Sequence, residues 1–279
     1  MGGSGEIFVN GRWLAPAEAG IPADDRGLAF SEGLFETFRV RQGRPCLLQE
    51  HLGRLKASCT FLGIPYPQDD LAALAVEGAR RHGLEDASAR VTVTAGAGGD
   101  LAGPGTRPGA LIVQIRPAIG PGNGLRLHLA SLRQSATSVL MRHKTLRYLE
   151  RVLAVREAKA AGADEAVFLN DLEELAEGTT SSIFWVKGGA VLTPSLDCNI
   201  LPGVTRTVVL KAARELGLPV REVRTGPEAL ALADEAFLTS ATRGVAPAVS
   251  LSGRPIGSGK PGPLTQKLSP VVAKLEESG

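Results

Sequence analysis

The sequence predicts an α+β protein built from two domains. Segments whose apolar residues alternate with polar ones, as in half-buried strands, are interspersed with segments that have helical spacing. The eight residues from Pro117 to Gly124 include two prolines and three glycines, which suit the interior of neither a helix nor a strand. A chain of 279 residues is long enough for two compact domains. We therefore expect a smaller α/β domain at residues 1–117, a linker at 118–124 and a larger domain at 125–279.

The first domain is expected to combine strands with two helices. Asn10-Gly11 supplies the two positive-φ positions of a tight turn and predicts a hairpin over 7–14. The acidic pair Asp69-Asp70 favours the start of a helix. The other expected elements are a strand at 34–40 that turns at 42–43 and returns at 46–48, helices at 49–62 and 69–81, and strands at 89–95 and 110–115.

The second domain is expected to mix strands and helices along the chain. Leu125, Leu127 and Leu129 alternate with polar residues and mark its first strand. Gly203 precedes an amphipathic run, as expected at the start of a helix. The expected strands are 125–130, 165–169, 183–186, 190–192, 220–223 and 235–239, and the expected helices are 146–161, 204–216, 227–232 and 263–277.

The composition excludes several classes of function. The net charge of +2 and the lack of a dense basic cluster argue against a nucleic-acid partner. No apolar run has the roughly 18 residues of a membrane span, and Met1–Gly5 lacks the apolar core of a signal peptide. Cys46, Cys59 and Cys198 are too few and too scattered for a disulfide framework or a zinc site, and the four histidines have no metal-binding spacing. We expect a cytoplasmic protein without a metal.

Three features together predict a pyridoxal phosphate enzyme. Lys144 precedes an amphipathic segment, and its amine could carry the cofactor covalently. Glu177, just before a run of hydroxyl residues, could pair with the pyridine nitrogen. Gly203-Val204-Thr205 opens a helix whose first amides could bind a phosphate. The hydroxyl-bearing segment Thr239–Thr242, which follows a strand, suits a similar role.

Each feature alone has an ordinary structural explanation. An arbitrary lysine is most often a solvated residue at a helix start, a glutamate in a turn often lies on the surface, and many helices begin with glycine without binding a ligand. The segment Gly96–Gly103 superficially resembles a dinucleotide fingerprint, but it leads into prolines and then a strand, with no helix start for a pyrophosphate. We interpret it as a mobile loop beside a substrate site.

Four segments of the chain resemble the class IV aminotransferase family, the fold-type IV pyridoxal phosphate enzymes. Asp25-Arg26-Gly27 with Ser31–Thr37 resembles the N-terminal signature, and His51-Leu52-Gly53-Arg54-Leu55 resembles the H-x-x-R-L helix. His143–Leu146 is similar to the segment with the Schiff-base lysine, and Glu165–Arg206 is similar to the C-terminal signature. The resemblance is collinear over nearly the whole chain. It implies a two-domain fold like that of D-amino acid aminotransferase, and a homodimer.

The resemblance also implies roles for individual residues. Lys144 would hold pyridoxal 5'-phosphate as a Schiff base and shuttle the proton, and Glu177 would hold the pyridinium. The phosphate would be bound by Arg54, Val204, Thr205, Ser240 and Ala241, and the substrate would lie beside Phe35, Thr37 and Arg90. Two positions depart from the pattern: Ser182 stands where most relatives have asparagine, and Ala241 stands where several have a phosphate-binding threonine.

The reaction implied is transfer of an amino group between an amino acid or related amine and a 2-oxo acid. The alternative is 4-amino-4-deoxychorismate lyase, which releases pyruvate and 4-aminobenzoate in folate biosynthesis and is favoured by the Lys144-to-Tyr148 spacing and the loop at 95–99. A protein that binds the cofactor without turnover is a third, weaker alternative. A D-amino acid enzyme is the least favoured transaminase, because Ala95 stands where those relatives place an arginine. Arg90 resembles the position of an arginine in branched-chain enzymes.

Overall fold

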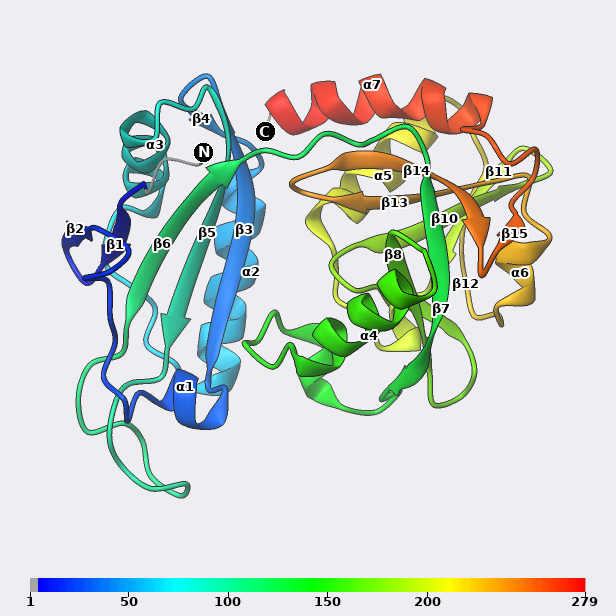
Figure 1. Cartoon of the computed structure of the whole chain (residues 1–279). Coiled ribbons are helices and arrows are strands. Elements are labelled where there is room, and N and C mark those ends of the chain that lie inside the picture. Colours follow the sequence, from blue (N-terminus) through cyan, green and yellow to red (C-terminus); the bar gives the residue numbers. More distant parts are fainter. Residues whose placement is uncertain (1–4, 279) are drawn as a thin grey trace. The chain divides into compact units, whose positions relative to one another are not determined.

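The computed structural model describes residues 5–278, and only the backbone of Ser278 (Figure 1). Met1–Ser4 lie outside the described residues. They belong to the N-terminal segment in which we expect no signal peptide. Helices and strands are mixed along the chain, which confirms the α+β class. The chain forms two compact units. The first contains the residues up to Ile119 together with His143–Arg147, and the second contains Gly120–Arg142 and Tyr148–Ser278.

The first unit contains a six-stranded sheet in the order β2-β1-β6-β5-β3-β4, in which all neighbours are antiparallel. Asn10 and Gly11 have φ angles of 46° and 88°, which confirms the predicted hairpin. The strands are β1 (Ile7–Val9), β2 (Arg12–Leu14), β3 (Gly33–Arg41), β4 (Arg44–Pro45), β5 (Asp86–Thr94) and β6 (Leu111–Pro117).

Two helices cover one face of this sheet, and both were expected. They are α2 (Leu48–Leu62) and α3 (Leu71–Arg81), and their apolar residues share one core with β3, β5 and β6. The Asp70 carboxylate caps α3 by accepting a hydrogen bond from the Ala73 amide at 3.0 Å. A short helix, α1 (Arg26–Phe30), was not expected, because five residues are too few to show a helical period.

The second unit contains a nine-stranded sheet whose main path is β12-β11-β10-β13-β14-β7-β8-β9, with β15 paired to β14. Its strands β7 and β8 run parallel, and β14 runs parallel to β7. The strands are β7 (Leu125–Gln134), β8 (Glu165–Asn170), β9 (Leu175–Gly178), β10 (Ser182–Lys187), β11 (Ala190–Pro194), β12 (Val220–Val223), β13 (Glu235–Ser240), β14 (Gly244–Leu251) and β15 (Arg254–Pro255).

Four α-helices pack on the second sheet. Helix α4 contacts β7 and β8 through Ala154 and Ala158, whereas α5 and α7 contact each other and strand β13. The helices are α4 (Leu149–Ala160), α5 (Val204–Glu215), α6 (Glu228–Ala231) and α7 (Pro263–Ser278), with short 3-10 turns at Val139–Arg142 and Leu196–Cys198. Among the described helices, none is long and apolar enough to cross a membrane.

Candidate functional site

Lys144 lies beside strand β3 rather than at a helix start. The amide of Phe35 donates to the Lys144 carbonyl at 2.9 Å, and the amide of Leu146 donates to the Gly33 carbonyl at 3.0 Å. Leu34 and Thr145 form an antiparallel bridge between these bonds. The helix expected at residue 146 therefore begins only at Leu149, because residues 144–146 pair with β3 instead. This pairing fixes the lysine backbone against the first sheet.

The Lys144 amine lies over an aromatic ring that a second cation also contacts. Its Nζ is 4.4 Å from the centroid of the Phe35 ring, and Arg90 Cζ is 3.6 Å from the same centroid. Thr37 is directly opposite Arg90 in the β3–β5 register, so Phe35, Thr37 and Arg90 share one face of the sheet. The three residues assigned to the substrate side are thus brought together beside Lys144.

His143 anchors the segment on the side of α2. Its ring stacks on Phe61 with the centroids 4.4 Å apart, and its Nδ1 is 2.9 Å from Ser58 Oγ. Burial lowers the pKa of His143 below its usual value, which favours the neutral ring. The side chain next to the lysine is therefore held by packing and by one hydrogen bond.

Arg54 is held by Glu36 on the other face of β3. Successive strand residues point to opposite faces, so Glu36 faces α2 while Phe35 faces away from it. Arg54 Nε and Nη2 donate to the two Glu36 oxygens at 2.7 and 2.8 Å, and His51 Nδ1 lies 2.8 Å from the same carboxylate. Glu36 and His51 both stand in segments that resemble family signatures, but no pattern in the sequence indicated that they meet Arg54 in one cluster.

Glu177 is a buried carboxylate in the second unit. It lies on β9, is 4% exposed, and accepts a hydrogen bond from Arg151 Nη2 at 2.6 Å. The amide of Leu201 donates to the other carboxylate oxygen, Oε2, at 3.3 Å. Gln134 Nε2 donates to Oε1, the oxygen that Arg151 also contacts, at 3.4 Å. The charge of Glu177 raises the pKa of Arg151, although burial acts in the opposite direction. Arg151 is a further residue of the site that the sequence did not reveal.

The start of α5 presents backbone amides to one end of the second sheet. Gly203 is the N-cap, and its lack of a side chain leaves the first turn without a side-chain cap. A Cβ at this position would meet Ser182 Oγ at 2.7 Å, so glycine permits a close approach between α5 and β10. The Thr205 hydroxyl donates to Glu276 of α7 at 3.2 Å.

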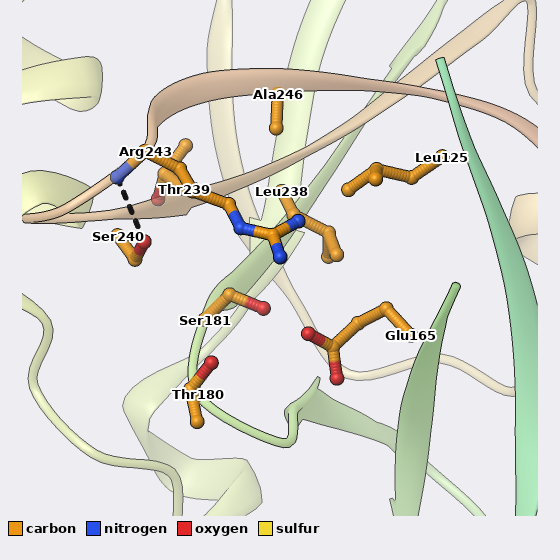
Figure 2. Close-up of a pocket in the computed structure, with 9 residues that line it drawn as sticks. All are labelled: Leu125, Glu165, Thr180, Ser181, Leu238, Thr239, Ser240, Arg243 and Ala246. Atoms are coloured by element: carbon orange, nitrogen blue, oxygen red, sulfur yellow. Dashed lines mark hydrogen bonds between the residues drawn. The ribbon is translucent and has the colours of Figure 1, made fainter. Parts of the chain in front are cut away.

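A small pocket in the second unit is lined by residues of β7, β8, β13 and β14 and by the segment that precedes β10 (Figure 2). The turn from Ser240 to Gly244 forms part of its wall, and the Arg243 amide donates to Ser240 Oγ at 3.3 Å. Ala241 has no hydroxyl, so only its backbone can contribute to this turn. The pocket is lined by Leu125, Glu165, Thr180, Ser181, Leu238, Thr239, Ser240, Arg243 and Ala246.

The predicted site residues therefore fall into two groups. Arg54, Phe35, Thr37, Arg90 and Lys144 belong to the first unit, where Lys144 adjoins the substrate-side residues. The second unit holds Glu177, Val204, Thr205, Ser240 and Ala241. Within residues 5–278 no cluster of histidine, cysteine and carboxylate side chains suits a metal ion.

The chain is similar to known proteins both in sequence and in fold. The family described as amino-transferase class IV matches residues 33–251. The chain is 34% identical to a putative branched-chain-amino-acid aminotransferase of Methanocaldococcus jannaschii, over 94% of this chain and 93% of that protein. It is 32% identical to an aminodeoxychorismate lyase of Bacillus subtilis, over 86% of this chain and 85% of that protein.

A solved structure shows the same fold. The branched-chain amino acid aminotransferase of Thermobaculum terrenum, in its PLP-form, superposes with a TM-score of 0.87 and is 27% identical, covering 100% of this chain and 95% of the other. The family match includes β3, with its contacts to Lys144, and extends through β14. The chain is thus an enzyme that belongs to the class IV aminotransferase family.

Proposed function

We propose that this enzyme uses pyridoxal 5'-phosphate to transfer an amino group between an amino acid, or a related amine, and a 2-oxo acid. The observation that carries the proposal is the placement of the Lys144 amine over Phe35, beside Arg90 and Thr37. An amine held against the face of a ring, next to the proposed substrate-side residues, is positioned to act as a nucleophile.

The donors in both units fit the chemical groups of the cofactor. A phosphate needs N–H and O–H donors, which Arg54, the uncapped amides of Val204 and Thr205, Ser240 and the amide of Ala241 provide. A pyridine nitrogen that carries a proton needs a carboxylate, and Glu177 is buried and oriented by Arg151. We propose that these residues hold the cofactor together with Lys144.

Each residue then has a defined task. When bound, the cofactor supplies an electron sink for the negative charge that forms on the substrate α-carbon. Lys144 would hold the cofactor covalently, and its Nζ, once free, would take the proton from the substrate α-carbon. Glu177 keeps the ring nitrogen protonated, and Phe35 and Arg90 limit where the lysine amine can move.

The similarity to the Bacillus subtilis lyase supports a second candidate, elimination of pyruvate from aminodeoxychorismate. The residues proposed to hold the cofactor serve either reaction, so they do not distinguish the two. The similarity to the putative branched-chain enzyme is slightly higher, and the Thermobaculum terrenum structure is also of a branched-chain enzyme. We therefore place transamination first.

The first experiment is an absorbance spectrum of the purified holoenzyme before and after adding a panel of amino acids. A transaminase converts the bound cofactor to its amine form with one class of donor and returns it with a 2-oxo acid. Release of pyruvate from aminodeoxychorismate without that conversion would instead identify the lyase. Lys144→Ala and Lys144→Arg should both abolish turnover. Alanine removes the amine, and arginine keeps the charge but does not give up its proton, so it cannot act as a nucleophile or base. A wild-type protein that takes up no cofactor would overturn the proposal.

We also propose that the enzyme forms a homodimer. Leu28 and Phe30 of α1 are 64% and 45% exposed, and two large apolar side chains exposed on one short helix form a candidate contact surface for a second copy of the chain. Light scattering should give twice the mass of the 29.1 kDa chain. Replacing both residues with serine should shift the population toward the monomer, and an unchanged mass would exclude α1 from the interface.

A further inference from the structure

Asn199 makes three side-chain hydrogen bonds to the connecting segment, residues 135–142, which follows strand β7. Its Nδ2 donates to the Ser135 carbonyl at 2.9 Å and to the Ser138 carbonyl at 2.8 Å. Its Oδ1 accepts from Arg142 Nε at 3.2 Å. Asn199 is only 4% exposed, so water cannot readily replace these bonds. One side chain therefore holds the beginning, the middle and the end of the connecting segment.

The backbone around Asn199 is held independently of this side chain. Its amide donates to the Leu196 carbonyl at 3.0 Å, and its φ angle of 59° lies in the left-handed region, which asparagine tolerates better than most residues. Ile200 is 1% exposed, and the Leu201 amide donates to Glu177 Oε2 at 3.3 Å. This stretch of backbone therefore stays in place without the Asn199 side chain, next to the carboxylate proposed to hold the cofactor ring.

The connecting segment is the part of the second unit that leads to Lys144. Arg142 is its last residue, and the chain crosses to the first unit at His143. Two residues of chain span about 7 Å at most, so the position of Arg142 limits where the Lys144 backbone can lie. The pairing with β3 anchors Lys144 in the first unit, and Asn199 anchors the chain that arrives from the unit that contains Glu177.

We propose that Asn199 is a positioning residue for Lys144. It fixes the second-unit end of the chain that carries the lysine, so that Lys144 Nζ meets the cofactor aldehyde. This inference rests on the proposed function, in which the neutral amine adds to the aldehyde carbon. The two amine hydrogens leave with the aldehyde oxygen as water, and a carbon–nitrogen double bond remains. The residues proposed to hold the ring and the phosphate all lie outside the connecting segment.

The test uses a variant that removes the side chain without straining the backbone. Asn199→Gly meets this need, because glycine adopts positive φ angles freely. Asn10→Gly is the matched control: Asn10 also has a positive φ angle, 46°, and its Oδ1 accepts from the Leu111 amide at 2.7 Å, but it lies in the β1–β2 hairpin. Both variants should keep a cooperative thermal unfolding transition.

The first measurement follows the connecting segment by hydrogen exchange in the cofactor-free protein, because exchange reports local opening of the backbone. The Met141 amide donates to the Ser138 carbonyl at 3.1 Å. Its exchange should become about tenfold faster in Asn199→Gly, which loses the bonds that hold the segment. Asn10→Gly should exchange at this amide as wild type does. Unchanged exchange of Met141 in Asn199→Gly would overturn the proposal.

The second measurement compares the binding of two forms of the cofactor. Pyridoxal phosphate has the aldehyde that bonds to Lys144, whereas pyridoxamine phosphate has an amine in its place and binds without that bond. Asn199→Gly should bind pyridoxal phosphate about tenfold more weakly and pyridoxamine phosphate as tightly as wild type and Asn10→Gly do. An equal loss for both forms would mean that Asn199 supports the whole site rather than the lysine, which contradicts the proposal.

Asn199→Asp provides a second variant with a side chain of the same size. It keeps the acceptor for Arg142 but replaces the N–H donors with an oxygen that faces the Ser135 and Ser138 carbonyls. It should therefore also weaken binding of pyridoxal phosphate alone. If wild type binds both cofactor forms and neither Asn199 variant changes that binding, the positioning role is wrong. A wild-type protein that binds neither form would reject the proposed function, and the positioning role with it.

Discussion

Glu36 organises the best-defined ionic cluster of the first unit. It is 1% exposed, and burial by itself would raise its pKa. Hydrogen bonds from His51 and Arg54 outweigh this effect and lower the pKa of Glu36 from 4.5 to about 2. Burial also lowers the pKa of His51, with a contribution from the charges of Arg54 and Lys144. Glu36 is thus ionised at every pH where the enzyme would work, and it holds the arginine proposed to bind phosphate.

This pKa shift predicts a loss of stability in acid. A group whose pKa is lower in the folded protein contributes its full stability above the unfolded pKa and loses it as the pH falls toward the folded pKa. For Glu36 the window runs from about 4.5 down to about 2, and its contribution is about 3 kcal/mol. Denaturant unfolding of wild type and Glu36→Gln should show a shallower pH dependence in the variant.

The exposed Glu215→Gln variant is the control for this measurement, because it should retain the wild-type pH dependence. Equal slopes for wild type and Glu36→Gln would contradict the role of Glu36.

At the scale of single residues, the sequence points to reactive groups but not to the residues that position them. Lys144, Glu177 and Arg54 were predicted, but the contacts of Arg54 with Glu36 and of Glu177 with Arg151 were not. These partners are 18 and 26 residues apart in the chain, and only the folding of separate elements brings them together. The assigned roles of the site residues remain predictions.

At the scale of elements, long periodic segments were predicted well and short or irregular ones were not. Helices α2, α3, α5 and α7 begin and end within two residues of expectation. Strand β14 was missed because Gly244 and Pro247 are unfavourable in a strand, and β9 because it has only four residues. The start of α4 was placed too early because the pairing of residues 143–147 with β3 is a tertiary effect.

The loop between β5 and β6 ends near Gly109, where the neighbouring backbone leaves no room for a side chain. A Cβ on Gly109 would lie 2.1 Å from the Thr94 carbonyl, and a backbone atom cannot rotate away. Gly109→Ala should therefore lower the free energy of unfolding by about 1–3 kcal/mol. Gly120→Ala is the matched control, since nothing lies within 4 Å of its Cβ. Equal thermal midpoints for the two variants would show that the base of the loop adapts.

Helix α7 places a carboxylate beside the first turn of α5. Glu276 is 8% exposed and accepts the Thr205 hydrogen bond, so its charge opposes binding of a phosphate there. Glu276→Gln should tighten binding of pyridoxal phosphate several-fold and leave binding of pyridoxal unchanged. Fluorescence titration of the cofactor-free protein measures both. Weaker binding of pyridoxal phosphate would instead mean that Glu276 orients Thr205 for the ligand.

At the scale of the whole molecule, the chain passes between the two units more than once. It leaves the first unit after Ile119, returns to it for His143–Arg147 and then completes the second unit. The sequence showed the proline- and glycine-rich segment where the first crossing occurs. It did not show the return, because a five-residue segment paired with a distant strand leaves no periodic pattern.

The return segment, His143–Arg147, limits where the gene can be split to give two fragments that fold. A split in the linker would give a first fragment that contains β3 and Arg54 but not Lys144. The first fragment would then lack His143–Arg147 of its own unit, so we expect it to be unstable alone, whereas the second fragment would hold its own unit together with the return segment. Coexpression should restore cofactor uptake, because the second fragment would supply the strand-like segment to β3. In a library of circular permutants that is selected for activity, variants with new termini within residues 143–147 should be depleted.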